Sequence, residues 1–208
     1  SVGVSEKALK RAGVAYEKIY IHPFSHATYY PGAQQMCLKL LFTREGRVLG
    51  AQIVGGEGVD KRIDVLATAM QAGLGVTDLE RLELAYAPPY GSAKDPVNFA
   101  GYVAGNVLSG ETVPVHADAL PADACLLDVR DPGECASGTI PGALTIPLGQ
   151  LRQRMGELPR DRTIVSYCAV GLRGYLAERI LRQSGFTVCN LSGGIATWRL
   201  FQGSALVH

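Results

Sequence analysis

The sequence lacks the features that mark several broad classes of protein. Its 20 Lys and Arg residues nearly balance its 19 Asp and Glu residues, so no overall field predicts a nucleic-acid or anionic-membrane partner. No apolar run approaches the roughly 18 residues that a membrane-spanning helix needs, and the first ten residues carry no secretory signal. The five cysteines include no CxxC pair, and their odd number disfavours a disulfide framework. We therefore expect a globular protein of the cytoplasm, with no nucleic-acid or membrane partner.

An uneven composition predicts two domains. All six lysines and seven of the nine tyrosines precede residue 110, whereas the remainder has arginine as its only cation besides histidine. Residues 109–124 are rich in turn formers and small residues, as a linker would be. We place the boundary near residue 111, so the expected domains are 1–110 and 111–208. A chain of 208 residues is long enough for two modest cores.

The first half has the pattern of an α+β domain. Residues 36–42 and 47–54 are apolar runs joined by a short polar segment with a glycine, which predicts an antiparallel hairpin. Apolar side chains recur at helical spacing over residues 59–72 and stop at Gly73, which indicates an amphipathic helix. A further strand is expected over 16–21 and a second helix over 97–108. The sheet should therefore be antiparallel.

The second half alternates short apolar runs with helical stretches. Strands are expected over 125–129, 163–167 and 187–191. Helices are expected over 148–158 and 172–184. This alternation predicts an α/β domain with a parallel sheet, in which a site lies at the carboxyl ends of the strands.

Cys168 is the candidate nucleophile at that edge of the sheet. It directly follows the strand over 163–167 and precedes a tight loop that enters a helix. The inward N–H groups of such a loop, the positive end of the helix and Arg173 together favour the thiolate, which is the nucleophilic form. The alternative is a small inert core cysteine at the end of a buried strand, and both interpretations stay open on position alone.

The same loop geometry could serve phosphate or sulfur chemistry. Cysteine phosphatases place five residues between the nucleophile and its arginine, whereas four separate Cys168 from Arg173. Gly174 also stands where a phosphatase would have Ser or Thr. The shorter loop favours a sulfane sulfur on cysteine, and a phosphatase-like or arsenate-reducing activity is the alternative.

Ordered motifs after residue 110 resemble a rhodanese domain. They are LLDVR at 126–130, IPGA at 140–143, YCAVGLR at 167–173 and LSGGIATW at 191–198. The resemblance implies that Cys168 accepts a sulfane sulfur as a persulfide and passes it to a thiophilic acceptor. The implied donors are small: thiosulfate, polysulfide, persulfides or CoA persulfide. The residues implied to hold the donor are Ala169, Val170, Gly171, Leu172, Arg173 and Gly174. A structural role, tying the first strand to its loop, is implied for Asp128, Arg130 and Glu134.

Residues 1–110 resemble the C-terminal dimerisation domain of flavin-dependent pyridine nucleotide-disulfide oxidoreductases. HATYYPG at 26–32 and AYAPPYGSAKDPVN at 85–98 resemble the coenzyme A-disulfide reductase branch. Together the halves resemble the C-terminal portion of a CoA-disulfide reductase and rhodanese fusion, also described as an NADH-dependent persulfide reductase. The resemblance implies a homodimer in which tyrosines of this domain reach toward the partner's site. The candidates are Tyr29, Tyr30, Tyr86 and Tyr90, and simple packing of an interface is the alternative for each.

No glycine-rich turn of the dinucleotide-binding type is present. Residues 55–58 (GGEG) are too compact for the GxGxxG spacing. We therefore expect no cofactor on this chain alone, and FAD, NAD(P)H and CoA only in a longer parent that carries the missing flavin and nicotinamide domains. Cys37 should be buried packing inside a strand rather than a redox centre.

The remaining polar residues predict no further chemistry. The histidines His22, His26 and His116 have no ligand spacing with any cysteine, so no metal is expected. We expect a solvated face for Lys39, Lys61 and Arg62. Contacts of these side chains with CoA phosphates are the alternative.

A function of another class also fits the sequence. The first half could hold a homodimer while the second docks a sulfur-carrying partner without catalysis. Formation of a persulfide on Cys168 distinguishes the enzyme from this assembly module.

Overall fold

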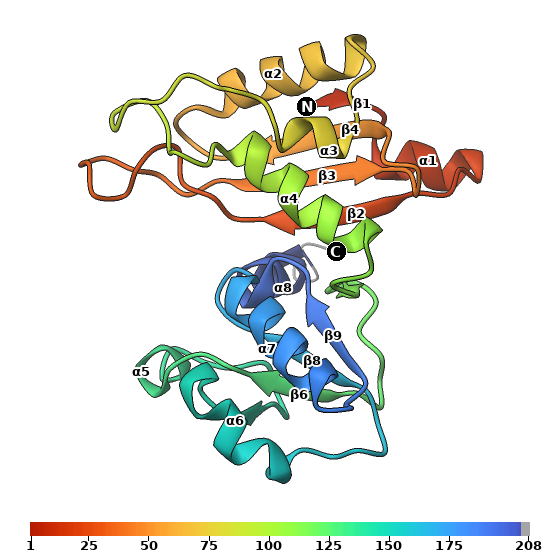
Figure 1. Cartoon of the computed structure of the whole chain (residues 1–208), viewed down its shortest axis with the longest axis vertical. Helices are drawn as coiled ribbons and strands as arrows, with labels where there is room; N and C mark the ends of the chain where they lie inside the picture. The colour runs from red at the N-terminus through yellow and green to blue at the C-terminus, as the bar shows by residue number, and fades with distance from the viewer. Residues whose placement is uncertain (205–208) are drawn as a thin grey trace. The chain divides into compact units, whose positions relative to one another are not determined.

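The chain divides into two compact units in the computed structural model, which describes residues 1–204 (Figure 1). The first unit is Ser1–Ser109, and the second begins at Gly110. Residues 205–208 of the domain expected over 111–208 lie outside the described residues.

The first unit is an antiparallel sheet with four helices, in the strand order β1-β4-β3-β2. The strands are β1 (Val2–Gly3), β2 (Glu17–Ile21), β3 (Cys37–Phe42) and β4 (Val48–Val54). The helices are α1 (Glu6–Ala12), α2 (Val59–Gln71), α3 (Val76–Leu79) and α4 (Pro96–Leu108). The predicted α+β class with an antiparallel sheet is confirmed, and the hairpin turn contains Gly46 at φ 87°.

Alternation along the strands gives this sheet two different faces. Leu38, Leu40 and Ile53 point into the main core, which α2 and α4 cover. On the opposite face, Leu41 and Leu49 pack against Leu9 of α1 in a smaller cluster. The polar side chains of β3 and β4 therefore share the face on which α1 lies.

The second unit is a parallel sheet in the strand order β5-β9-β8-β6-β7. Its strands are β5 (Pro114–Val115), β6 (Cys125–Asp128), β7 (Leu144–Thr145), β8 (Ile164–Tyr167) and β9 (Val188–Leu191). Its α-helices are α5 (Pro132–Cys135), α6 (Leu151–Arg154), α7 (Leu172–Gln183) and α8 (Gly194–Ser204), with 3-10 turns η1 (Leu148–Gln150) and η2 (Met155–Glu157). The predicted α/β class with a parallel sheet is confirmed.

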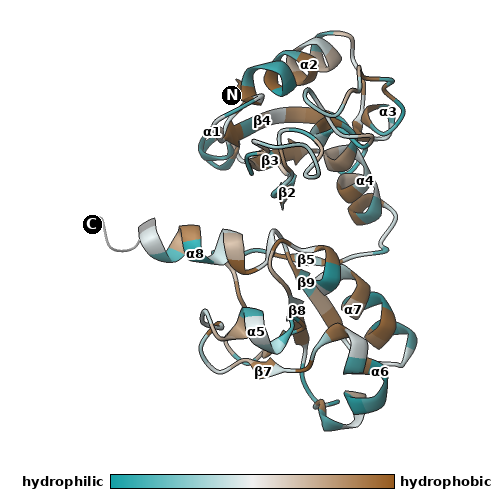
Figure 2. Ribbon diagram, turned by 90° about the vertical axis from the view of Figure 1, so that its left-hand side faces the viewer, coloured by the Kyte–Doolittle hydropathy of each residue, from teal (hydrophilic) through white to brown (hydrophobic). Residues whose placement is uncertain are grey.

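Two hydrophobic clusters cover the two faces of this sheet. One contains Leu127, Ile164 and Leu181, and the other contains Val165, Leu191 and Ile195. Figure 2 shows the hydrophobic colouring on the central strands, with the charged positions on the outer surfaces of the helices. Both faces are buried because α7 contacts β8 and β9 while α8 contacts β9.

The helix predicted over 148–158 is wrong as a single element. The segment forms η1, α6 and η2 in succession. Gly149 and Gly156 lie in the two 3-10 turns, and glycine destabilises a continuous helix by roughly 1 kcal/mol relative to alanine. The stretch over 109–124, expected as a linker, also supplies the edge strand β5.

Candidate active site

Cys168 lies at the carboxyl end of β8, between the two neighbouring strands β6 and β9. The residue is only 1% exposed, so it is buried at this edge of the sheet. The Gly171 N–H donates a hydrogen bond to the Cys168 Sγ at 3.2 Å. The loop thus directs a backbone hydrogen-bond donor at the Cys168 sulfur.

The loop that follows Cys168 is short because Gly171 makes the turn into α7. Gly171 has φ 118°, a backbone conformation that residues other than glycine rarely adopt. The Asn190 Nδ2 donates to the Gly171 carbonyl at 3.3 Å and so holds the turn against β9. Leu172 begins α7 and is 55% exposed, while Ala169 and Val170 are half-buried. The positive end of a twelve-residue helix therefore lies at the loop.

Helix α8 fixes the backbone of the same loop from its other side. The Ile195 N–H donates to the Cys168 carbonyl at 2.9 Å, and the Ala196 N–H donates to the Ala169 carbonyl at 3.0 Å. Gly194 permits this approach, because a Cβ at that position would lie 2.4 Å from the Cys168 carbonyl oxygen. The first turn of α8 thus orients the nucleophile's main chain.

Gly174 has a packing role in the first turn of α7. A Cβ there would lie 2.4 Å from the Asn190 Oδ1 and 3.2 Å from the Tyr167 Cα. Gly174 is buried, so it lets α7 press against β8. Helix packing therefore explains why a glycine stands at position 174, without any contact between Gly174 and a sulfur donor.

Arg173 is held by a carboxylate from α5. Its two terminal nitrogens donate to the two oxygens of Glu134, each at 2.7 Å, and one of them also lies 3.4 Å from Asp131. The hydrogen bonds from Arg173 lower the pKa of Glu134 to about 2. The same bond raises the pKa of Arg173, and the nearby Cys168 sulfur adds to that rise. The Arg173 guanidinium is thus held by a carboxylate at the loop that follows Cys168.

The assignment of Glu134 to the first strand holds for its backbone, because its carbonyl accepts a hydrogen bond from Arg130 at 3.4 Å, but not for its carboxylate. Asp128 and Arg130 do form the expected buried pair after β6, with the Arg130 Nε 2.9 Å from an Asp128 oxygen. Arg130 also donates to the Gly138 carbonyl at 2.8 Å, which secures the loop that contains α5. The Glu134 carboxylate instead contacts Arg173, because the carboxylate of Asp128 already occupies the Arg130 side chain.

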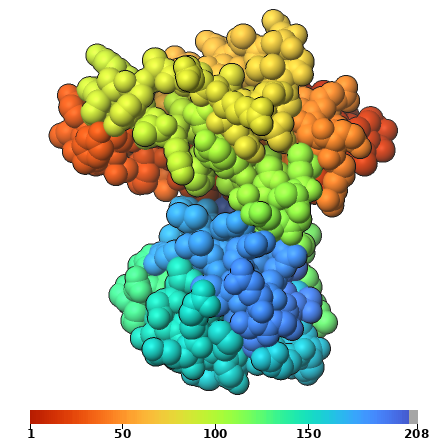
Figure 3. Space-filling model, in the orientation of Figure 1, coloured from red at the N-terminus to blue at the C-terminus, as the bar shows by residue number. Residues whose placement is uncertain are grey.

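The candidate tyrosines lie on two loops of the first unit that project at the same end (Figures 1 and 3). The Tyr29 and Tyr86 hydroxyls are 2.6 Å apart and share a hydrogen bond, which raises the pKa of Tyr29. Tyr30 contacts the His26 ring edge-on. Tyr90 lies on the second loop and, like Tyr29, is 73% exposed. The structure therefore brings Tyr29 and Tyr86 together, 57 residues apart in sequence.

A buried ion pair holds these tyrosine loops in place. The Arg62 terminal nitrogen lies 2.8 Å from Asp95 and donates to the Ser25 carbonyl at 2.8 Å. The Ala27 N–H also donates to the Gly91 carbonyl at 2.9 Å. The expectation of a solvated face is wrong for Arg62, which is 1% exposed because it links Ser25 in the first loop to Asp95 at the end of the second.

The glycine-rich segment between β4 and α2 does not fit a dinucleotide. A cradle for a pyrophosphate needs open space above its glycines. A Cβ on Gly56 would lie 1.9 Å from the Gln34 Oε1, and one on Gly58 would lie 2.3 Å from the Arg62 guanidinium. Side chains of the first unit fill this space.

Residues 1–204 contain neither a metal cluster nor a membrane-spanning helix. No three His, Cys, Asp or Glu side chains there come together as a metal site would require. No helix of that part is long and apolar enough to cross a membrane. Cys37 is half-buried at the start of β3, and burial raises the pKa of its thiol.

Sequence reasoning missed the contributions of Glu134, Asn190 and Gly194. Gly194 lies in the motif over 191–198 and Glu134 is expected only at the first strand, but their partners are 26 and 39 residues away. Only the three-dimensional arrangement pairs them with the loop. In the sequence, the one local signal of such a close approach between backbones is a pair of glycines at the start of a helix.

Comparison with known families identifies both units. The dimerisation domain of the pyridine nucleotide-disulphide oxidoreductases matches residues 1–95, and the rhodanese-like domain matches residues 114–200. The chain therefore consists of a pyridine nucleotide-disulphide oxidoreductase dimerisation domain followed by a rhodanese-like domain.

Two solved structures are similar to nearly the whole chain, and one curated relative is similar to half of it. The reduced CoADR-RHD of Bacillus anthracis is 45% identical, with a TM-score of 0.91 over 94% of this chain and 36% of that one. A NAD-dependent persulfide reductase from A. fulgidus is 43% identical, with a TM-score of 0.86 over 95% of this chain and 36% of that one. Coenzyme A disulfide reductase of Staphylococcus aureus is 45% identical over 105 residues, which are 50% of this chain and 24% of the relative. The chain thus spans about a third of these solved proteins.

Proposed function

We propose that this chain is the sulfur-transfer and subunit-pairing part of a CoA-disulfide or persulfide reductase, with Cys168 as the sulfur-carrying nucleophile. The observation that carries the proposal is the loop around Cys168, in which the Gly171 N–H points at the sulfur and Arg173 lies alongside it. The rhodanese-like family and the persulfide reductase relative support the choice of sulfur chemistry.

The proposed half-reaction with thiosulfate transfers one sulfur atom. The Cys168 thiolate attacks the outer sulfur of thiosulfate, a new S–S bond forms, and the bond to the sulfonate sulfur breaks. Sulfite leaves with the electron pair of that bond, and Cys168 remains as a persulfide anion. An acceptor thiolate or cyanide then attacks the terminal sulfur, which returns Cys168 to the thiolate.

The loop stabilises the charge at each stage. The Gly171 N–H and the positive end of α7 face the sulfur that carries the negative charge. Arg173 would bind the anionic end of the donor, together with the backbone of residues 169–172. The same guanidinium is paired with Glu134, so donor and carboxylate compete for it.

The first unit would pair two subunits through its family's dimerisation surface. Tyr29, Tyr30, Tyr86 and Tyr90 are proposed to face the partner subunit and contribute phenolic hydrogen bonds to a CoA thiol site there. The bonded pair of Tyr29 and Tyr86 is the observation that favours a joint role for these loops. FAD, NAD(P)H and CoA would bind in the full-length reductase of the cytoplasm, where its further domains supply their sites.

Intact mass of the purified chain before and after incubation with thiosulfate or polysulfide tests the proposal. We expect wild type to gain one sulfur atom that cyanide removes as thiocyanate. Cys168→Ala should gain none, because its side chain has no sulfur nucleophile. Cys189→Ala is the matched control: it removes another thiol of the same sheet and should keep the adduct.

Two other outcomes would overturn this proposal. A folded wild-type chain without any adduct would favour the assembly module that only docks a sulfur-carrying partner. Hydrolysis of an aryl phosphate, abolished in Cys168→Ala, would instead assign phosphatase-like chemistry to the loop.

A further inference from the structure

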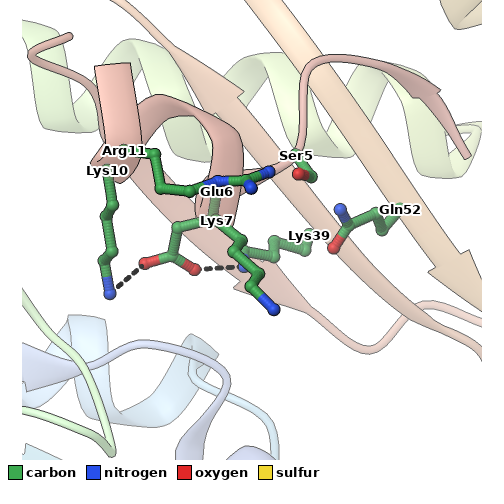
Figure 4. Close-up of a pocket in the computed structure, with 7 residues that line it drawn as sticks. All are labelled: Ser5, Glu6, Lys7, Lys10, Arg11, Lys39 and Gln52. Atoms are coloured by element: carbon green, nitrogen blue, oxygen red, sulfur yellow. Dashed lines mark hydrogen bonds and ion pairs between the residues drawn. The ribbon is translucent and has the colours of Figure 1, made fainter. Parts of the chain in front are cut away.

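The polar cluster beside α1 in the first unit has a structural role. Glu6 of α1 is paired with Lys10 of the same helix and with Lys39 of β3, one at each carboxylate oxygen (Figure 4). The Lys18 ammonium of β2 lies 2.9 Å from one of these oxygens as well. These ion pairs fasten α1 to the sheet.

A second polar cluster lies in the sheet of the second unit, next to the Cys168 loop. Side chains two residues apart on a strand share a face, so Ser166 lies on the face of β8 that carries Ile164 and Cys168. Asn190 of β9 is the partner of Ser166 in the register of the two strands. The preceding row of this face, Ile164 and Val188, is apolar. The row nearest the loop is therefore the polar one.

Both side chains of this polar row are hydrogen-bonded to the start of α7. The Ser166 hydroxyl donates to the Gly174 carbonyl at 2.9 Å and also lies 3.2 Å from the Cys189 carbonyl oxygen. The Asn190 Nδ2 donates to the Gly171 carbonyl at 3.3 Å. Two adjacent strands therefore hold the first turn of α7 at two of its carbonyls.

Burial makes the Asn190 amide unfavourable for stability alone. Its Oδ1 atom is buried and has no hydrogen-bond partner within the described part of the chain. A buried amide oxygen without a donor costs free energy, which an apolar side chain of similar size avoids. The amide is therefore better explained by the Gly171 carbonyl that its Nδ2 group holds in place.

Gly171 needs such support because its own backbone is permissive. It has φ 118°, and a glycine can leave this conformation without the steric barriers that restrict other residues. Its two torsion angles relate the direction of its carbonyl to that of its N–H, which donates to the Cys168 Sγ at 3.2 Å. A bond that fixes the carbonyl therefore also restricts the N–H.

We propose that Ser166 and Asn190 are positioning residues, which hold the first turn of α7 so that the Gly171 N–H stays directed at the reacting sulfur. The inference rests on the proposed function, in which Cys168 carries that sulfur. In that function Arg173 binds the donor, whereas the two positioning residues act only through the loop. Loss of either one should therefore slow sulfur transfer and leave donor binding intact.

The rate of persulfide formation on Cys168 tests this role when it is measured at increasing thiosulfate by quenched flow and intact mass. The limiting rate should fall about tenfold in Asn190→Leu and several-fold in Ser166→Ala, because the charge on the sulfur loses an aligned donor. The half-saturating thiosulfate concentration should stay unchanged in both variants.

Ser184→Ala is the matched control for these variants. It removes a hydroxyl that donates to the Ile180 carbonyl at 3.1 Å, at the other end of the same helix. The control should keep the limiting rate of wild type. An equal loss of rate in Ser184→Ala would show that general loosening of α7 is responsible, and would overturn the proposal.

Hydrogen exchange of the Gly171 amide, followed by NMR, tests the positioning without turnover. The exchange should be several-fold faster in Asn190→Leu than in wild type, because the N–H is no longer held toward the sulfur. Wild type that forms no persulfide would reject the sulfur transfer itself, and the exchange alone would then decide the positioning role. Unchanged exchange, an unchanged limiting rate in both variants, or a weaker donor affinity at an unchanged rate would overturn the proposal.

Discussion

Arg173 is paired with Glu134 at the loop, and in the proposed function it also binds the anionic donor. The Glu134 carboxylate engages it through two parallel hydrogen bonds of 2.7 Å. An anionic donor that approaches Cys168 needs the same guanidinium. In the proposed function, Arg173 attracts the donor and Glu134 limits the strength of that attraction.

This competition predicts opposite effects of two neutral substitutions on thiocyanate formation from thiosulfate and cyanide. Glu134→Gln should lower KM for thiosulfate by several-fold, because Arg173 loses a carboxylate at 2.7 Å and keeps only the longer contact of 3.4 Å with Asp131. Arg173→Gln should raise that KM by about tenfold, because the donor loses its charged partner. Steady-state kinetics of both variants measure the two shifts.

Another Arg and Glu pair in the same unit supplies the control. The Arg154 Nε lies 2.7 Å from Glu157, and both side chains are exposed. Glu157→Gln should leave KM unchanged. If Glu134→Gln raised KM as much as Arg173→Gln, the pair would be purely structural.

At the scale of elements, the approach of α8 to the nucleophile depends on Gly194. This residue has φ 59°, and its Cα lies against the Cys168 carbonyl. Gly194→Ala should therefore destabilise the second unit by roughly 1–3 kcal/mol through backbone strain and the close contact. It should also slow formation of the Cys168 persulfide, because the Cys168 carbonyl must shift.

Gly142→Ala separates the two causes of this loss. Gly142 has φ 79°, but nothing lies within 4 Å of a Cβ there. Urea unfolding should show only the strain, about 1 kcal/mol, with normal persulfide formation. Equal losses of stability and of persulfide in both variants would contradict a special role for Gly194.

The elements that sequence predicts well are those with a long local pattern. Helix α2 repeats its apolar residues and stops before Gly73, and β8 precedes the Cys168 loop as expected. Helix α1 was missed although Ser5 caps its start and Gly13 its end, because seven residues carry little periodicity. The two-residue strands β5 and β7 carry no pattern and form only because a neighbouring strand pairs with them.

Prediction of the site divides in the same way. Cys168 and Arg173 were found from a contiguous loop after a strand. The contact of Arg173 with Glu134, and the bond between Tyr29 and Tyr86, join segments 39 and 57 residues apart. Their pairing depends on tertiary packing, which a single sequence does not display.

At the scale of the whole molecule, separate cores predict separate unfolding. The main core of the first unit contains no residue of the second, and the two large clusters of the second contain none of the first. The only tryptophan, Trp198, packs against a cluster of the second unit. Tryptophan fluorescence should therefore follow the second unit alone, while circular dichroism follows both.

Comparison of these two probes during urea unfolding measures that independence. Gly194→Ala should shift the fluorescence transition to lower urea and leave the remaining part of the dichroism transition in place. A single coincident transition that moves as a whole in the variant would show instead that the two units unfold as one.

The hydrogen bonds from α8 to the Cys168 loop also have a consequence for biosynthesis. Ile195 and Ala196 hold the carbonyls of Cys168 and Ala169, so the loop needs residues that are translated later than the nucleophile itself. A growing chain that ends between Cys168 and Gly194 has the thiol but lacks the turn of helix that orients it. The loop therefore reaches its final geometry only after nearly the whole second unit has emerged from the ribosome.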